Sequence, residues 1–339
     1  MIVGFFTILY IKQGRSTNVL PPISVVMTWL LILFVIISIA FSPIDLYGDK
    51  YNYSYIFDNI NLNNINLTKD LGWSYYTYFS KSIFGESQFY FLITAFVYVF
   101  GYYIFAKKYI PYNNIFIFLL ACFSSFGFLS YGVNTIRAGF SMALLLIAFT
   151  VPKNKVIFIL LSIFAILSHK TMVLPLFAFI LTKYFNDPKA FFKIWLIALV
   201  ISFINLSFVS VFIQSNLGSF DERSTGYFGT EDSEVYNSGF RLDFIVYSVI
   251  PILLGFYYIV KLKINDFFYN RLFNVYLLIN AFWLLVIRMD YTDRMAYLSW
   301  FLIPYIVLYP LLKYKLKINQ KKYVIIILIG IISFTSYIS

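Results

Sequence analysis

The stretch VIFILLSIFAILSHKTMVLPLFAFILT, residues 156–182, decides on which side of the membrane each later segment of the chain lies. Its centre is Ser168-His169-Lys170, so it could form one long membrane-spanning helix or two short helices that meet at these polar residues. One crossing would place the acidic segment 214–243 on the same side of the membrane as the lysine-rich connections, whereas a hairpin separates them. We therefore predict a hairpin.

Each arm of this hairpin has about 15 residues and reaches about 23 Å at 1.5 Å per residue, less than the hydrocarbon core of about 30 Å. The turn should therefore stop short of the outer interface. Non-helical backbone at that depth requires burial by protein or a water-filled cavity. We predict an outward-facing pocket at His169, the single histidine of the chain.

The composition predicts an all-α polytopic membrane protein, because 61% hydrophobic and 12% charged residues cannot form a soluble globule with a polar surface. Residues 1–11 are too short for a clear span, and they lack the features of a removable signal peptide. We predict about 11–12 transmembrane helices in one domain, residues 1–339. Besides the hairpin, apolar runs of suitable length occupy residues 24–42, 88–106, 113–131, 134–151, 194–213, 244–260, 272–288, 295–312 and 323–338.

When these runs cross the bilayer one after another, the charged residues separate between the two faces of the membrane. One face receives 17 of the 26 Lys and Arg residues and only two of the 15 acids, Asp187 and Asp266. The positive-inside rule makes this face cytoplasmic. The outer face receives the segments 42–87 and 214–243, which are long enough to hold structure of their own and which we expect to carry function.

The sequence excludes several other chemistries. Cys122 is the single cysteine, so no disulfide or thiolate metal site forms within one chain. Asp45 and Asp49 could bind a divalent ion, but no further carboxylate spacing supports a metal. No glycine-rich phosphate loop is present. We predict no cofactor, no metal and no nucleic-acid partner.

Three polar residues in YGVNTIRAGFS, residues 131–141, are spaced for one stripe of a helix: Asn134, Arg137 and Ser141. A buried arginine keeps its proton and needs an anion or water, so an arginine inside a membrane span indicates a functional site. The alternative is an arginine that extends to the interface.

Further arginines, Arg241, Arg288 and Arg294, fall on the outer face. The planar guanidinium suits bidentate recognition of phosphate oxygens, so several of them together suggest a diphosphate ligand. The alternative is a set of structural ion pairs with Asp243, Asp290 and Asp293.

Aromatic residues accompany carboxylates in the first outer segment, and Tyr53, Trp73 and Tyr76 are our candidates for sugar binding. Flat rings stack on the apolar face of a pyranose, and Asp49 could take a hydroxyl proton as general base. These aromatics could instead be interfacial anchors. His169 could donate to a phosphate or move a proton, or it could be structural.

The chain resembles the EpsG family of Wzy-like bacterial polysaccharide polymerases along most of its length. The resemblance rests on GDKYNY (residues 48–53), GVNTIRA (132–138), Lys155 and SHK (168–170). The chain departs from the family's usual pattern at two places. Ser42-Pro43-Ile44 stand where the family often has an arginine, and Arg137 is followed by alanine where the family often has glutamine. The first leaves one fewer basic group near Asp49.

The resemblance implies a GT-C-like glycosyltransferase that joins undecaprenyl-diphosphate-linked repeat units on the outer side of the bacterial cytoplasmic membrane. The product would be O-antigen, capsule or exopolysaccharide, and a chain-length regulator is a possible partner beside the membrane lipids. Arg137, Arg241, Arg288 and Arg294 would hold the diphosphate and His169 would assist. Asp49 would activate the acceptor, with Asn134 and the aromatic residues around the sugar.

Two rival functions use the same residue types. A flippase for lipid-linked sugars also needs outer arginines and aromatics, but transporters tend to show interrupted helices in both halves, and the sequence shows one hairpin. An O-acyltransferase would need its histidine near a cytoplasmic acyl donor. The outer placement of His169 disfavours that activity.

Overall fold

The protein is described by a computed structural model for residues 25–44, 48–65, 70–204, 240–289 and 292–338. These residues form helices and no strands. The chain divides into two compact units, one of Met1–Val173 with Leu308–Ser339 and the other of Leu174–Val307, and each is described by itself. The predicted single domain stays a prediction.

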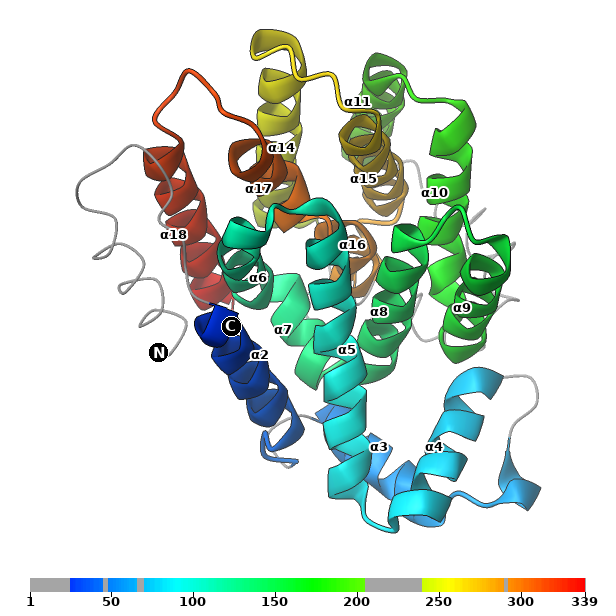
Figure 1. Cartoon of the computed structure of the whole chain (residues 1–339). Helices are drawn as coiled ribbons and strands as arrows, with labels where there is room; N and C mark the ends of the chain where they lie inside the picture. Colours follow the sequence, from blue (N-terminus) through cyan, green and yellow to red (C-terminus); the bar gives the residue numbers. More distant parts are fainter. Residues whose placement is uncertain (1–24, 45–47, 66–69, 205–239, 290–291, 339) are drawn as a thin grey trace. The chain divides into compact units, whose positions relative to one another are not determined.

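The first unit is built from short and long helices (Figure 1). In chain order it contains α2 (Val25–Ala40), α3 (Gly48–Asn59), η1 (Leu62–Asn64), α4 (Leu71–Phe84), α5 (Ser87–Tyr109), η2 (Tyr112–Asn114), α6 (Ile115–Phe123), α7 (Phe126–Val133), α8 (Ile136–Thr150), α9 (Lys155–Ser168), η3 (Lys170–Met172), the end of α17 (Ile303–Lys313) and α18 (Gln320–Ile338).

Helix α5 is the long axis of the first unit, with α3 and α4 at the end where it begins (Figure 1). It packs closely on α8 at Gly101, where an added Cβ would lie 2.7 Å from the Cβ of Ala143. The segment 42–87 was predicted to hold structure of its own. Its described part confirms this, since α3 and α4 form there.

The predicted helix 113–131 is wrong as a continuous element, because the chain bends by 69° between η2–α6 and α7. Ser124 and Ser125 turn their hydroxyls back onto carbonyls of α6, and the Ser125 Oγ donates to Cys122 O at 2.7 Å. Thr335 of α18 donates to the Ser124 carbonyl at 2.8 Å. Serine hydroxyls that compete for helix carbonyls explain the break.

The predicted interruption at residues 168–170 is present. Helix α9 ends at Ser168 after 14 residues, and His169 adopts an extended backbone with φ −156° and ψ 111°. A 3₁₀ turn follows, and α10 begins at Val173. A single continuous helix over residues 156–182 is therefore excluded.

The second unit contains α10 (Val173–Tyr184), α11 (Pro188–Ile204), α14 (Leu242–Phe256), η5 (Tyr257–Lys261), α15 (Phe267–Leu285), α16 (Thr292–Trp300) and the beginning of α17. Most of the outer segment 214–243 lies outside the described residues.

A buried polar network joins four helices of the second unit around Asn280 of α15. Its amide oxygen accepts from Trp195 Nε1 at 2.8 Å, and its amide nitrogen donates to the hydroxyls of Ser248 and Ser299 at 3.1 Å each. Asn280 is fully buried. Because each polar atom of the Asn280 amide finds a partner, the network holds the four helices in one register.

We expect Asn280→Leu to destabilise the protein by about 2 kcal/mol, since the Trp195 indole and two hydroxyls lose partners inside an apolar core. Tyr276→Phe removes one bond, from the phenol to Ser248 O at 2.8 Å, and should cost about 0.6 kcal/mol. Thermal unfolding in detergent, followed by tryptophan fluorescence, measures both. Equal melting temperatures for Asn280→Leu and wild type would contradict the role of the network.

Four helical segments among the described residues are long and apolar enough to cross a membrane, or five if the bent η2–α6–α7 pair counts as one. They are Ser87–Tyr109, Leu242–Lys261, Thr292–Lys313 and Gln320–Ile338. Val25–Ala40, Ile136–Thr150 and Lys155–Ser168 are shorter apolar helices. The predicted class, an all-α polytopic membrane protein, is confirmed, while the count of 11–12 spans stays a prediction.

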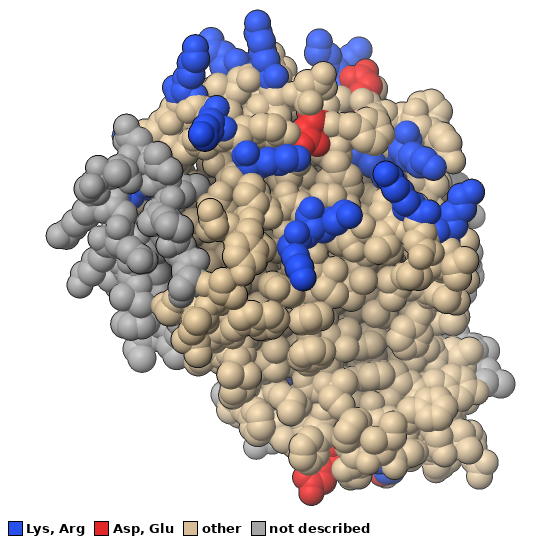
Figure 2. All heavy atoms as spheres, in the orientation of Figure 1, with Lys and Arg blue, Asp and Glu red and all other residues tan. Residues whose placement is uncertain are grey.

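In the first unit, the connections α5–η2, α8–α9 and α17–α18 lie at one end (Figure 1). Figure 2 shows Lys and Arg side chains gathered at this end of the face that it draws. In the second unit, the connections α10–α11 and α14–α15 likewise share one end. The connections that the sequence predicts to be lysine-rich therefore share one end within each unit. The cytoplasmic placement of these ends stays a prediction.

Candidate functional site

Arg137 lies in the first turn of α8, with its side chain 10% exposed. The prediction that Asn134 shares its helix is wrong, because α7 ends at Val133 and Asn134 is exposed in the connection. The connection is tight, since an added Cβ on Gly139 would lie 2.5 Å from Tyr131 O. Ser141 does follow Arg137 on α8, and its hydroxyl donates to the Arg137 carbonyl at 2.8 Å.

Asp70 forms the ion pair with Arg137, and sequence analysis missed it. Its carboxylate is 11% exposed and accepts from Arg137 Nη1. Asp70 precedes α4 with φ 46° and ψ 47°, a left-handed conformation that non-glycine residues rarely adopt and that is often found at functional sites. The anionic partner that a buried arginine requires is therefore a residue 67 positions earlier in the chain.

Aromatic rings surround this end of α4. The ring of Trp73 lies 5.6 Å from that of Tyr53 and 5.5 Å from that of Phe140, and Tyr76 stacks on Phe140 at 4.7 Å. Trp73 is only 4% exposed, whereas Tyr53 and Tyr76 are half-buried. Trp73 thus lies at the buried bottom of the aromatic cluster, and Tyr53 and Tyr76 are its more accessible members.

Burial raises the pKa of Tyr76 to about 12, so its hydroxyl stays protonated at neutral pH. This hydroxyl pairs with Thr94 Oγ1 of α5 at 2.8 Å. The pairing fixes α4 on α5 and holds the aromatic cluster in place.

The start of α4 also packs on the end of α9. An added Cβ on Gly72 would lie 3.0 Å from Leu167 Cβ and from Ser168 Oγ, which is closer than most Cβ contacts, so this packing favours a glycine. His169 follows Ser168 directly, and Asp70 lies two positions before Gly72. The first outer segment, the Arg137 motif and the His169 interruption therefore meet in the first unit.

Asp49, the predicted base, is the second residue of α3 and is half-buried. Its neighbour Lys50 is 1% exposed and binds the end of α2. Lys50 Nζ donates to Ala40 O at 2.9 Å, to Ser42 O at 2.6 Å and to Ile39 O at 3.2 Å. Lysine in the GDKYNY motif thus fastens α3 to α2.

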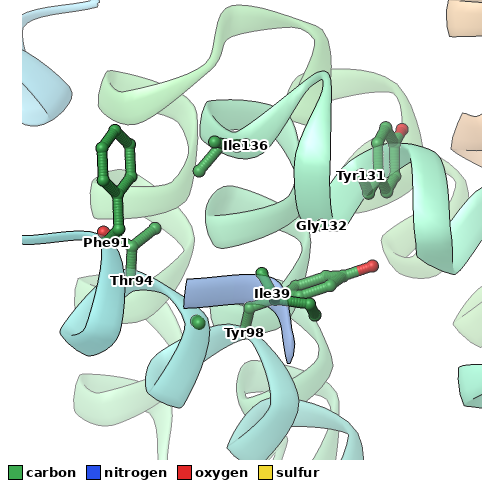
Figure 3. A pocket seen from close by; sticks show the side chains of 8 residues that line it. Ile39, Phe91, Thr94, Tyr98, Tyr131, Gly132 and Ile136 are labelled. Atoms are coloured by element: carbon green, nitrogen blue, oxygen red, sulfur yellow. The ribbon is translucent and has the colours of Figure 1, made fainter. Parts of the chain in front are cut away.

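A small recess lies between α2, α5, α7 and the start of α8. It is lined by Ile39, Phe91, Thr94, Ala95, Tyr98, Tyr131, Gly132 and Ile136 (Figure 3). Its free volume of about 10 Å³ suffices for about one water molecule. It is too small for a sugar, and the outward-facing pocket predicted at His169 stays a prediction.

Two of the predicted arginines of the second unit, Arg241 and Arg288, meet at Phe240, where α14 begins and just after α15 ends. Arg241 donates to both carboxylate oxygens of Asp243, at 3.0 and 2.7 Å. The hydrogen bond to Asp243 raises the pKa of Arg241, with a smaller contribution from the charge of Asp293. Arg288 is exposed, and its guanidinium carbon lies 4.8 Å from the centre of the Phe240 ring. Phe240 directly precedes Arg241 in the chain.

Arg294 lies in the first turns of α16 and is half-buried. Asp243 therefore pairs with one predicted arginine, as the structural alternative proposed, while the exposed Arg288 donates to the Ser202 carbonyl at 3.4 Å. Asp290 lies outside the described residues. Within the described residues, no three His, Cys, Asp or Glu side chains are grouped to bind a metal ion.

The fold defines an all-α, multi-pass membrane protein whose first unit joins a buried arginine–aspartate pair to aromatic rings and an interrupted helix. The chain belongs to the EpsG family, whose sequence model matches residues 2–339. This membership indicates a membrane protein of polysaccharide biosynthesis that is similar to polysaccharide polymerases. Comparisons with curated proteins and with solved structures gave no match.

Proposed function

We propose that the protein is a glycosyltransferase that polymerises undecaprenyl-diphosphate-linked oligosaccharide repeat units on the outer face of the bacterial cytoplasmic membrane. The observation that carries this proposal is the meeting of Arg137, the half-buried rings of Tyr53 and Tyr76, and the His169 interruption in the first unit of an EpsG-family chain. A guanidinium suits a diphosphate and the rings suit a sugar.

The proposed reaction transfers a saccharide from one lipid diphosphate to a hydroxyl of another lipid-linked unit. Arg137 stabilises the negative charge that develops on the leaving diphosphate, and His169 donates a hydrogen bond there. Tyr53 and Tyr76 contact sugar rings, supported from below by Trp73, and exposed Asn134 donates to sugar hydroxyls. A carboxylate of the first outer segment accepts the acceptor proton.

Purified protein in nanodiscs tests the function directly. Lipid-linked saccharide, extracted from cells in which the gene has been deleted, is added without nucleotide or partner protein, and products are resolved by gel electrophoresis and mass spectrometry. Elongation by whole repeat units with release of lipid diphosphate supports a polymerase. Lipid-linked saccharide that stays one unit long in the presence of folded protein would reject it.

In the second unit we propose that Arg241, Arg288 and Arg294 bind a lipid diphosphate. Arg241→Lys keeps the charge but loses the fork that meets both Asp243 oxygens. Because Arg241 is about one-third exposed, the fold should tolerate the change. We expect turnover to fall about tenfold and the polymer to become shorter at unchanged protein level.

Chain-length distribution on gels measures this effect, with quantification of the protein by an epitope tag. Lys81→Arg, a charge-conserving change elsewhere on the outer side, is the control. Normal polymer length in Arg241→Lys at normal protein level would remove Arg241 from the diphosphate site.

A flippase for the same lipid-linked saccharides is the second candidate, and the interruption at residues 124–125 favours it, since interrupted helices are typical of transporters. Both interruptions, at 124–125 and at His169, lie in the first unit instead of at matching positions in two repeats. Movement of fluorescent lipid-linked saccharide between leaflets without bond formation would establish a flippase.

A further inference from the structure

A carboxylate outside the recognised motifs lies at the centre of the first-unit site. We propose that Asp70, rather than Asp49, is the catalytic base, and that it pairs with Arg137 until a lipid diphosphate takes its place. This inference rests on the proposed function, and it assigns one chemical step of that function to one residue.

The position of Asp70 is the first argument. It starts α4, the helix that also carries Tyr76 and the buried Trp73 beneath it, so a sugar in contact with Tyr76 lies close to the carboxylate. Gly72, two residues further, packs on Ser168 at the His169 interruption. Asp49 lies on α3, which meets this cluster through the contact of Tyr53 with Trp73.

The pairing with Arg137 is the second argument. Both side chains are about one-tenth exposed, so the carboxylate is held ready in a site with little water. A diphosphate carries more negative charge than a carboxylate and offers oxygens in the geometry that a guanidinium prefers. Diphosphate binding therefore displaces Asp70 from Arg137, and the released carboxylate becomes a proton acceptor only when the donor is present.

The backbone of Asp70 is the third argument. Asp70 has a left-handed backbone, which few non-glycine residues other than asparagine and aspartate adopt. Here the Asp70 carbonyl accepts from Ser74 N at 3.0 Å while the side chain reaches Arg137. The carboxylate is thus aimed by the start of the helix, and it keeps this direction when its partner changes.

The proposed step transfers the donor saccharide to the acceptor hydroxyl. The acceptor hydroxyl gives its proton to the Asp70 carboxylate, and its oxygen forms a bond to the anomeric carbon of the donor sugar. The bond from that carbon to the diphosphate oxygen breaks, and the electron pair leaves with the lipid diphosphate. Arg137 neutralises the charge that accumulates on this leaving group.

Asp70→Asn tests the role of Asp70, because it keeps the shape of the side chain and removes its basicity. We expect turnover of lipid-linked saccharide to fall at least 100-fold. Binding of undecaprenyl diphosphate, measured by microscale thermophoresis in nanodiscs, should stay equal or become tighter, because Arg137 no longer has an anionic competitor. Asp58→Asn, an exposed aspartate on α3, is the matched control and should behave as wild type.

The swapped pair Asp70→Arg with Arg137→Asp separates catalysis from structure. It keeps both charges, so a purely structural pair would restore turnover, whereas a catalytic role of Asp70, of Arg137 or of both leaves the swap inactive at a recovered melting temperature. Asp70→Asn then tests Asp70 by itself, because it leaves Arg137 in place. Weaker diphosphate binding in parallel with lost turnover in Asp70→Asn would overturn the proposal. Lost turnover in Asp49→Asn with normal turnover in Asp70→Asn would also overturn it. An inactive wild type would instead reject the polymerase function itself.

Discussion

Arg137→Leu is expected to abolish polymer formation and to lower the free energy of unfolding by about 3–5 kcal/mol. The stability loss follows because the change leaves Asp70 buried without its cationic partner. The activity loss, about 100- to 1000-fold, follows because the guanidinium proposed to stabilise the charge on the leaving diphosphate is gone. Thermal unfolding and the chain-length assay measure the two effects separately.

The double variant Arg137→Leu with Asp70→Leu distinguishes the two effects. Replacing both members of a buried ion pair by apolar residues is often neutral for stability, so the melting temperature should recover while turnover stays lost. Arg137→Lys should retain most of the stability and lose turnover, because a lysine lacks the bidentate fork. Full activity in either variant would show that Arg137 serves the fold alone.

The fold was predictable where hydropathy and charge vary along the chain. Apolar runs predicted α2, α5 and α18, and the polar centre of residues 156–182 predicted the interruption at His169. The bend at Ser124 was missed, because two serines barely lower the mean hydropathy of an apolar run. Their effect comes from hydroxyls that bond back to α6 and from Thr335, 211 positions away.

The sequence predicted which types of residue form the site, but it did not predict which residues pair with one another. The sequence indicated that Arg137 needs an anion, but Asp70 lies in a polar segment without periodicity, and no local pattern joins it to Arg137. The available signal was an aspartate directly before the aromatic run LGWSYYTY, where a helix begins. Trp73 looked like an open sugar platform, yet rings from α3, α5 and α8 bury it.

Lys50→Met is expected to destabilise the protein by about 3 kcal/mol at neutral pH. The ammonium is buried, lies 4.8 Å from the centre of the Phe91 ring and donates to three carbonyls at the end of α2, where the helix dipole favours a cation. Methionine keeps the length of the side chain and leaves those carbonyls without this donor. The loss should also detach α3, and with it Asp49 and Tyr53, from α2.

The pH dependence of this loss has a definite sign. Burial lowers the pKa of Lys50 to about 8, and the unfolded chain has a lysine pKa near 10.4. Between these values the unfolded state binds more protons, so the contribution of Lys50 to stability rises with pH, by about 2 kcal/mol from pH 7 to pH 9.5. The gap in melting temperature between wild type and Lys50→Met should therefore widen over this range. Lys81→Met is the control, because it removes a less buried lysine of α4 that donates to the Asp58 carbonyl at the end of α3. A gap that narrows as pH rises would contradict the lowered pKa of Lys50.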